Sequence, residues 1–241
     1  MKQPGHAAQQ ISVTQTRRFD IYANIHKALR MFMCDTLCMV GRLDGDDAQE
    51  VADGLEQVRE LIAICDSHLR HENDFIHTAM ETRRPGSSTV IAADHVHHEW
   101  ELAQLTALAN AVEQSRGAAR ASALDRLYRC LALFVSANLS HMNVEETEHN
   151  AVLWETHSDP EIIAIEQAIV ASLPPQESAS VMRWMIPAMN AAERAEKLSG
   201  IRQHAPVPVF DAMLAIAQAN LSERDWRKLA EALGIPARLA A

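Results

Sequence analysis

Aromatic residues and glycine are scarce in this chain. Only 5% of its 241 residues are aromatic, and it contains eight Gly and nine Pro. Strands favour aromatic and β-branched side chains, and sandwiches and barrels need many turns, so neither architecture is expected. Hydrophobic residues still make up 48% of the chain, which is long enough to bury a core without disulfides or metals. The composition therefore favours an all-α fold.

The chain also lacks an excess of basic residues. It has 22 Lys and Arg against 32 Asp and Glu, which gives a formal net charge of −10 with His neutral. No block of Lys and Arg stands out. A nucleic-acid backbone or an anionic membrane is therefore not an expected partner.

Long apolar runs are missing as well. No segment approaches the roughly eighteen uninterrupted apolar residues that indicate a membrane-spanning helix. Residues 1–16, MKQPGHAAQQISVTQT, lack the apolar core of a secretory signal and are expected to form a flexible tail. These absences predict a soluble, cytoplasmic protein.

The cysteines do not have the distribution of a secreted disulfide framework. All four lie within apolar helical segments rather than in loops, and reduced thiols are therefore expected. A thiol redox site is an alternative to inert packing, because two of them lie one helical turn apart. They are Cys34, Cys38, Cys65 and Cys130.

Apolar residues recur at three- and four-residue steps in four long segments, which predicts four amphipathic helices. Three short breaks, at Gly41, at RRPGSS and at Gly117, separate them. Short connections make consecutive helices neighbours, so we expect an antiparallel up-down four-helix bundle over residues 17–157. The segments cover about residues 17–40, 51–82, 89–115 and 119–156.

The remaining residues have a different character. Frequent prolines from Pro160 onward permit only short helices. Two helix N-termini can be predicted, because in each a capping side chain is followed by an acid three residues later. They are Asn190 with Glu193 and Ser222 with Asp225. We expect a smaller helical module over residues 158–241.

Histidine and glutamate recur together on the four predicted helices. A His-x-x-x-Glu spacing occurs in the second, third and fourth segments, and the first contributes a single His within its apolar stripe. Residues four apart share one face of a helix, so each pair can reach a common point. The candidate metal ligands are His26, His68, Glu72, His95, Glu99, His141 and Glu145.

Counting from the turns indicates that most of these residues lie at one depth. With residue 118 as a turn, His95 and His141 are each 23 residues away from it and therefore level. Glu72 and His95 lie 13 and 10 residues from Pro85, within one turn of each other.

The first two helices match less well. His26 precedes Gly41 by 15 residues, whereas His68 follows it by 27. Either residues 42–52 form a long loop, or the second helix extends beyond its partner.

Three carboxylates beside four imidazoles in one layer of a helical core require compensation. Buried ionised carboxylates are destabilising unless they are paired or metal-bound. Imidazole with carboxylate suits iron, zinc or manganese, whereas Cu(I) prefers sulfur. Six or seven ligands exceed a closed tetrahedral zinc site, and they fit two ions bridged by carboxylates about 3.5–4 Å apart.

The order of these residues resembles that of the hemerythrin-like (HHE cation-binding) domains of bacterial type. The resemblance covers about residues 17–157 and implies a four-helix bundle that holds two iron ions (Fe2+/Fe3+) with a bridging oxo or hydroxo group. Glu72 and Glu145 would be the bridging carboxylates. The terminal ligands would be His26, His68, His95 and His141.

Some positions leave alternatives within this pattern. Animal oxygen carriers of the family have a further histidine where this chain has Glu99, and a carboxylate there favours the ferric state over reversible oxygen carriage. A five-residue offset, found in some members, would select Glu146 in place of Glu145, and His98 is the alternative to His95. Four further histidines of these helices are expected to orient the ligands or to lie at the surface. They are His71, His77, His149 and His157.

The expected function is that of a di-iron protein that binds or senses oxygen, nitric oxide or peroxide. Its partners would be that small ligand and, through residues 158–241, another protein or a second copy of the chain. One alternative is an enzyme, a di-iron oxidase or peroxidase in which Glu99 shuttles protons. Another is an interaction module with a purely structural metal.

Overall fold

Every regular element of the described chain is helical. The computed structural model describes residues 18–237, and within that range no strand occurs. This confirms the all-α class predicted from the composition. None of the helices in these residues combines the length and apolarity that crossing a membrane requires. The expected tail at residues 1–16 lies outside the described residues.

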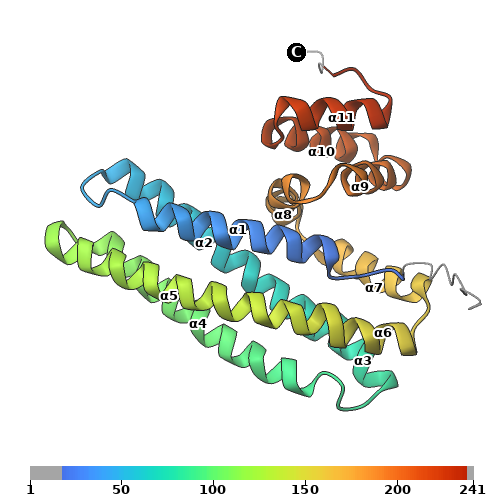
Figure 1. Ribbon diagram of the computed structural model, residues 1–241, viewed down its shortest axis with the longest axis horizontal. Coiled ribbons are helices and arrows are strands. Elements are labelled where there is room, and N and C mark those ends of the chain that lie inside the picture. The colour runs from blue at the N-terminus through green and yellow to red at the C-terminus, as the bar shows by residue number, and fades with distance from the viewer. Residues whose placement is uncertain (1–17, 238–241) are drawn as a thin grey trace, which may run out of the picture.

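Four long helical runs lie side by side (Figure 1). The first run contacts the second and the fourth, and the third run contacts the same two. Two of the runs contain a short π-helical segment, labelled η. The runs are α1 (Ala23–Arg42); α2 (Ala48–His71) with η1 (Glu72–His77) and α3 (Thr78–Arg83); α4 (Thr89–Gln114); and α5 (Gly117–Val144) with η2 (Glu145–His149) and α6 (Asn150–Thr156).

The connection between α1 and α2 is short. Only residues 43–47 separate them, and Asp47 caps α2 by accepting hydrogen bonds from the backbone N–H groups of Gln49 and Glu50. The unbroken run from Ala48 to Arg83 is therefore longer than the 20-residue α1. Of the two alternatives for this region, the second helix extends beyond its partner and no long loop forms.

A core of aliphatic side chains fills the space between these runs. α4 contributes buried residues at alternating four- and three-residue steps, which places them on one seam of the helix. α5 contributes a comparable stripe that includes Leu127, Leu131 and Phe134, all at most 1% exposed. Burying each such side chain stabilises the fold by about 1.5–3 kcal/mol.

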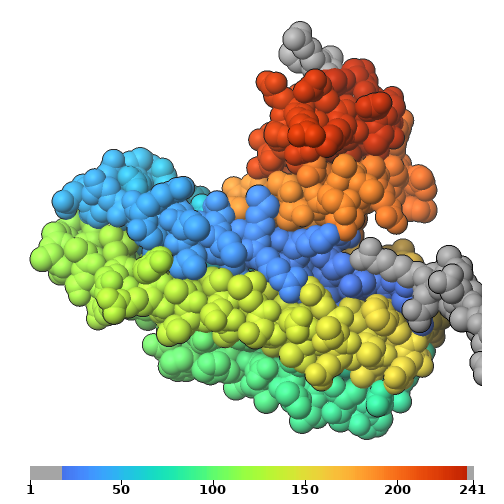
Figure 2. Space-filling model, in the orientation of Figure 1, coloured from blue at the N-terminus to red at the C-terminus, as the bar shows by residue number. Residues whose placement is uncertain are grey.

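The C-terminal helices have a core of their own, centred on Ile186, Leu198 and Ala217. As predicted, Asn190 and Ser222 cap the helices that follow them. The helices pack onto α1 through α8, where the ring of Trp184 stacks on Phe32 with centroids 4.0 Å apart. Figure 2 shows them, in orange and red, resting on the blue α1. They are α8 (Pro175–Ala188), α9 (Ala191–His204), α10 (Val207–Asn220) and α11 (Glu223–Leu233).

Helix α7 (Asp159–Ser172) belongs to neither of these cores. Its buried Ile162 joins a third cluster with Tyr22, Ile76 and Leu153, at the end of the long runs where η1 and α6 lie. Its N-terminus is held by a capping box between Ser158 and Glu161. α7 therefore closes one end of the long helices, next to the segments that carry the acidic residues described below.

Two leucines on α5 test this account of the core. Replacing the fully buried Leu131 with Ala should lower the free energy of unfolding by about 2–5 kcal/mol, because the neighbours cannot fill the cavity completely. Leu133, two residues away and 71% exposed, is the matched control, and its change to Ala should stay within about 0.5 kcal/mol. Urea unfolding measures both, and equal losses would contradict the packing described.

Candidate metal centre

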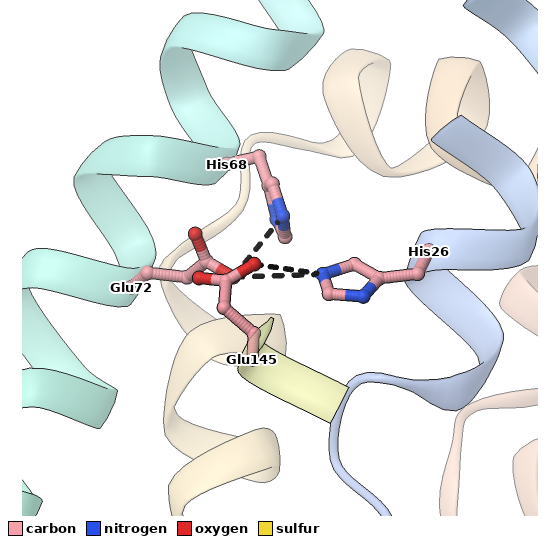
Figure 3. A group of neighbouring side chains, drawn as sticks. All are labelled: His26, His68, Glu72 and Glu145. Carbon is pink, nitrogen blue, oxygen red and sulfur yellow. Dashed lines mark ion pairs between the residues drawn. The ribbon is translucent and has the colours of Figure 1, made fainter. Parts of the chain in front are cut away.

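Six of the seven predicted ligands converge between the long helices, toward the end that α7 closes. Each of the four runs contributes at least one of them, and each glutamate is the first residue of a π-helical segment. Figure 3 shows His26, His68, Glu72 and Glu145 pointing toward one another. The side chains form two groups that share both glutamates. These groups are His26, His68, Glu72 and Glu145, and Glu72, His95, His141 and Glu145.

In the first group, two imidazole nitrogens face one oxygen of each acid. His68 Nε2 lies 3.1 Å from Glu72 Oε1. His26 Nε2 lies 3.7 Å from the same oxygen and 3.5 Å from Glu145 Oε2. Donor atoms bound to one ion at about 2.0–2.2 Å stand roughly 3.0–3.6 Å apart, so these separations are close to those of a ligand set.

The second group repeats the arrangement with the other two histidines. His95 Nε2 lies 3.5 Å from Glu72 Oε2 and 3.7 Å from Glu145 Oε1. His141 Nε2 lies 3.4 Å from Glu145 Oε1 and 3.1 Å from His95 Nε2. Two imidazole nitrogens and two carboxylate oxygens again face one point.

The two oxygens of each carboxylate are divided between the groups. Glu72 turns Oε1 toward His26 and His68 and Oε2 toward His95. Glu145 turns Oε2 toward His26 and Oε1 toward His95 and His141. A carboxylate in this position can bridge two ions, one in each group.

Hydrogen bonding within the protein does not satisfy these atoms. Glu72 and Glu145 are at most 1% exposed, and none of their four oxygens has a hydrogen-bond partner among the described residues. The same holds for the buried Nε2 atoms of His26 and His68. A buried, unpaired ionised group is strongly destabilising, so the residues present fit a bound cation.

In the metal-free protein, the pKa values of these acids and imidazoles depend on their burial and on their short distances from one another. Burial acts to raise the pKa of Glu72, but the charges of the nearby His68 and His26 outweigh it and hold that pKa well below its usual value. Burial acts to lower the pKa of His26, but its hydrogen bond to Glu146 and the charges of Glu145 and Glu72 raise it to about 9. Without a cation, protonated imidazole compensates the acids.

Two candidate ligands, His26 and His95, form hydrogen bonds through Nδ1, the ring nitrogen that faces away from the centre. His26 Nδ1 donates to Glu146 Oε1 at 3.1 Å, and Arg30 donates to both oxygens of that glutamate at 2.5 and 3.0 Å. His95 Nδ1 donates to Asn73 Oδ1 at 2.8 Å. Such contacts set the tautomer and leave the Nε2 lone pairs directed at the centre.

The two alternative ligands, Glu146 and His98, lie outside both groups of candidate ligands. Glu145 lies in both groups, whereas Glu146 lies behind His26 and pairs with Arg30. His95 lies in the second group, whereas Nδ1 of His98 is 2.8 Å from Glu101. The four-residue offset, not the five-residue one, therefore brings a carboxylate to the centre.

The prediction for Glu99 needs correction. It is exposed and joins neither group of candidate ligands. The buried seam of α4 advances from His95 to His98 and then to Leu102, steps of three and four residues. The fourth residue after His95 lies beyond the edge of that seam, so Glu99 points away from the other helices.

Two histidines and a tyrosine beside the centre were not predicted as part of it. His77 and His149 are 5% and 3% exposed, and a ligand atom of each lies within 4.8 Å of the other and of a Glu145 oxygen. Tyr22 OH lies 3.3 Å from His149 Nδ1. One sequence signal could have identified these two histidines, namely that each follows a central acid by four or five residues. In an α-helix, a residue five positions after the acid does not lie on the same face as the acid. The extra residue of a π-helical turn brings it back to that face.

Burial governs the protonation of these three residues. It lowers the pKa of His77 to about 4, assisted by the charge of His95, and it lowers the pKa of His149 as well. Burial, with the charges of Glu145 and Glu72, raises the pKa of Tyr22 well above its usual value. Both imidazoles and the phenol are therefore neutral at pH 7.

The other histidines and the cysteines lie elsewhere. His71 contacts Ser67 and Ser172, and His157 contacts Thr156. Among the described residues, no cysteine joins a group of candidate ligands. Cys34 and Cys38 are exposed, and Cys65 is buried in the aliphatic core with a pKa raised to about 12 by burial.

Comparisons with family models, with curated proteins and with solved structures give no match to this chain.

The raised pKa of His26 leads to a prediction for the metal-free protein. The stability that protonated His26 contributes is complete below its unfolded pKa of 6.5 and disappears as the pH rises to about 9. The melting temperature of the chelated protein should therefore fall between pH 6.5 and 9. The metal-loaded protein, whose acids are compensated by the ions, is the control, and a flat profile for the chelated protein would contradict the prediction.

Proposed function

We propose that the chain is a non-haem di-iron protein that binds or senses oxygen, nitric oxide or peroxide. We propose further that residues 17–157 form a hemerythrin-like, antiparallel four-helix bundle and that a smaller helical module follows. The observation that carries the proposal is the division of the Glu72 and Glu145 oxygens between two pairs of histidines.

The donor set supports two ions of intermediate hardness. Each group offers two imidazole nitrogens and two carboxylate oxygens, which suits iron, zinc or manganese. Iron is favoured among these by the order of the ligands along the chain, which resembles that of hemerythrin-like domains. His26, His68, His95 and His141 would hold the ions terminally, and Glu72 and Glu145 would bridge them.

Four protein donors to each ion leave positions for a small exogenous ligand. Iron, when bound, would supply a redox-active ion to which oxygen, nitric oxide or peroxide can coordinate. The protein would hold the ligands in place through Glu146 and Asn73 and would keep bulk water away, since His26, Glu72 and Glu145 are at most 1% exposed.

The position of α1 supports a sensing role. This helix carries His26, and its next residues contact the C-terminal helices. Lys27 pairs with Glu193 at 2.5 Å, Ala28 lies in the C-terminal core, and Phe32 stacks on Trp184. A change in the position of His26 would therefore be transmitted to those helices. The alternative enzyme, with Glu99 as proton shuttle, loses its proposed shuttle because that side chain is exposed away from the centre.

Metal analysis of two variants tests the proposal. Wild-type protein should contain about two iron ions per chain, and Glu72→Ala should lose both, because a bridging carboxylate serves both ions. Glu99→Ala is the matched control, an exposed glutamate on a neighbouring helix, and should retain wild-type iron. Wild-type protein without transition metal, or equal losses in the two variants, would refute the proposed centre.

Removal of the metal should destabilise the protein. Chelation leaves the two buried acids compensated only by protonated imidazole, and the bound ions stabilise only the folded state. For a chain of this length we expect the melting temperature to fall by about 5–10 °C. Calorimetry before and after chelation measures the change, and re-addition of iron should restore the original value.

The small ligand can be identified by spectroscopy. Anaerobically reduced, iron-loaded protein should change its visible absorption on exposure to oxygen, nitric oxide or peroxide. A reversible change supports binding or sensing, whereas continued consumption of peroxide indicates an enzyme. Absence of any change with all three would contradict both.

A further inference from the structure

A second polar cluster lies directly beside the proposed centre. It consists of Tyr22, His77 and His149, which are at most 5% exposed; Tyr22 is the N-cap residue of α1, and the two histidines lie in the second and fourth helical runs. The ring of His77 stacks on that of the ligand His95, with centroids 5.0 Å apart and an interplanar angle of 15°. The four-histidine centre is complete without these three residues, so their burial requires another reason.

His77 presents an unsatisfied group within this cluster. Its Nε2 is buried and has no hydrogen-bond partner within residues 18–237. Leaving a buried polar atom unpaired destabilises a protein by about 1–3 kcal/mol. Aliphatic side chains fill most of the core between the long helices, so an imidazole here indicates a partner that the described residues do not supply.

The spacing of the cluster fits one small atom. Ligand atoms of His77, His149 and Glu145 all lie within 4.8 Å of one another. Three points with that maximum separation have a common point no farther than about 2.8 Å from each, which is a hydrogen-bond distance. One oxygen or nitrogen atom placed there would contact both imidazoles and would also approach the Glu145 oxygen, at the edge of the metal centre.

A third cation fits this position less well than a hydrogen-bonded ligand. Glu145 is the one acid that the described part of the chain brings to this position, and its two oxygens already face the two histidine pairs. Adding a third divalent ion beside the other two would leave two buried carboxylates to compensate all three. Neutral imidazoles instead offer N–H groups to an uncharged or anionic molecule.

Tyr22 determines which nitrogen of His149 can donate. Its hydroxyl lies 3.3 Å from His149 Nδ1, and the phenol can donate its proton to that nitrogen. The remaining proton of the neutral imidazole then lies on Nε2. Tyr22 is thereby a positioning residue for the donor of His149.

We propose that Tyr22, His77 and His149 form the pocket that receives the exogenous ligand of the centre. The inference rests on the proposed di-iron function and names the chemistry of the ligand. It is a molecule or anion of two or three atoms, with a terminal oxygen or nitrogen that accepts hydrogen bonds from the two imidazoles. An apolar pocket beside the ions would not distinguish such a molecule from one without acceptors.

Azide, a small anion with terminal acceptors, is a suitable probe for iron-loaded protein. His77→Leu and His149→Leu should keep wild-type iron content, whereas the dissociation constant for azide, followed by visible absorption, should rise about tenfold in each. Tyr22→Phe keeps the ring and removes only the hydroxyl, and it should raise the constant about threefold. His204→Leu, at an exposed position of α9, is the control and should match wild type.

The outcomes separate this inference from the proposed function. Unchanged azide affinity in the folded histidine variants, or in Tyr22→Phe if those variants do not fold, would overturn the pocket and leave the di-iron centre standing. Loss of iron from either folded histidine variant would also overturn it, because the residue would then be a metal ligand. Wild-type protein without iron would refute the proposed function itself.

Discussion

The structure depends on the compensation of two buried carboxylates. Glu72 and Glu145 lie between the long helices, at most 1% exposed, and no side chain or backbone group of residues 18–237 forms a hydrogen bond to their oxygens. Such groups are tolerated only beside positive charge. The imidazoles around them supply that charge as protons or direct their lone pairs at a cation. Either way, all four helical runs must bring a residue to the same layer, which sets their relative positions along their axes.

The π-helical segments begin at those two acids. Each adds a residue to one turn of an otherwise regular helix, which changes the residues that face the centre beyond that point. His77 and His149 reach the edge of the proposed metal site as a result. A π-turn is less favourable than an α-turn, and two of them at equivalent positions are more readily explained by the requirements of the site than by packing. The same segments link the centre to the cluster that α7 closes.

Helix α1 connects the two cores of the molecule. It contributes His26 to the centre and Phe32 to the aliphatic core, while Ala28 belongs to the C-terminal core. Contacts of this kind would make the C-terminal helices sensitive to the position of His26, a candidate metal ligand. Through these contacts, a small displacement caused by ligand binding at the centre would move the C-terminal helices, since rigid helices transmit small displacements over several turns.

The sequence by itself determined the helical class, the positions of the main helix ends and six residues of the candidate centre. These follow from local rules, namely composition, the spacing of apolar residues and the four-residue offset that places His68 with Glu72 and His141 with Glu145. Only the tertiary structure decided that Glu99 points away and that His77, His149 and Tyr22 lie beside the centre. Whether a residue at the edge of a helical face points inward depends on the seam along which that helix meets its neighbours. A π-turn changes which face of the helix points inward after the acid. No local sequence pattern specifies either the seam or the π-turn.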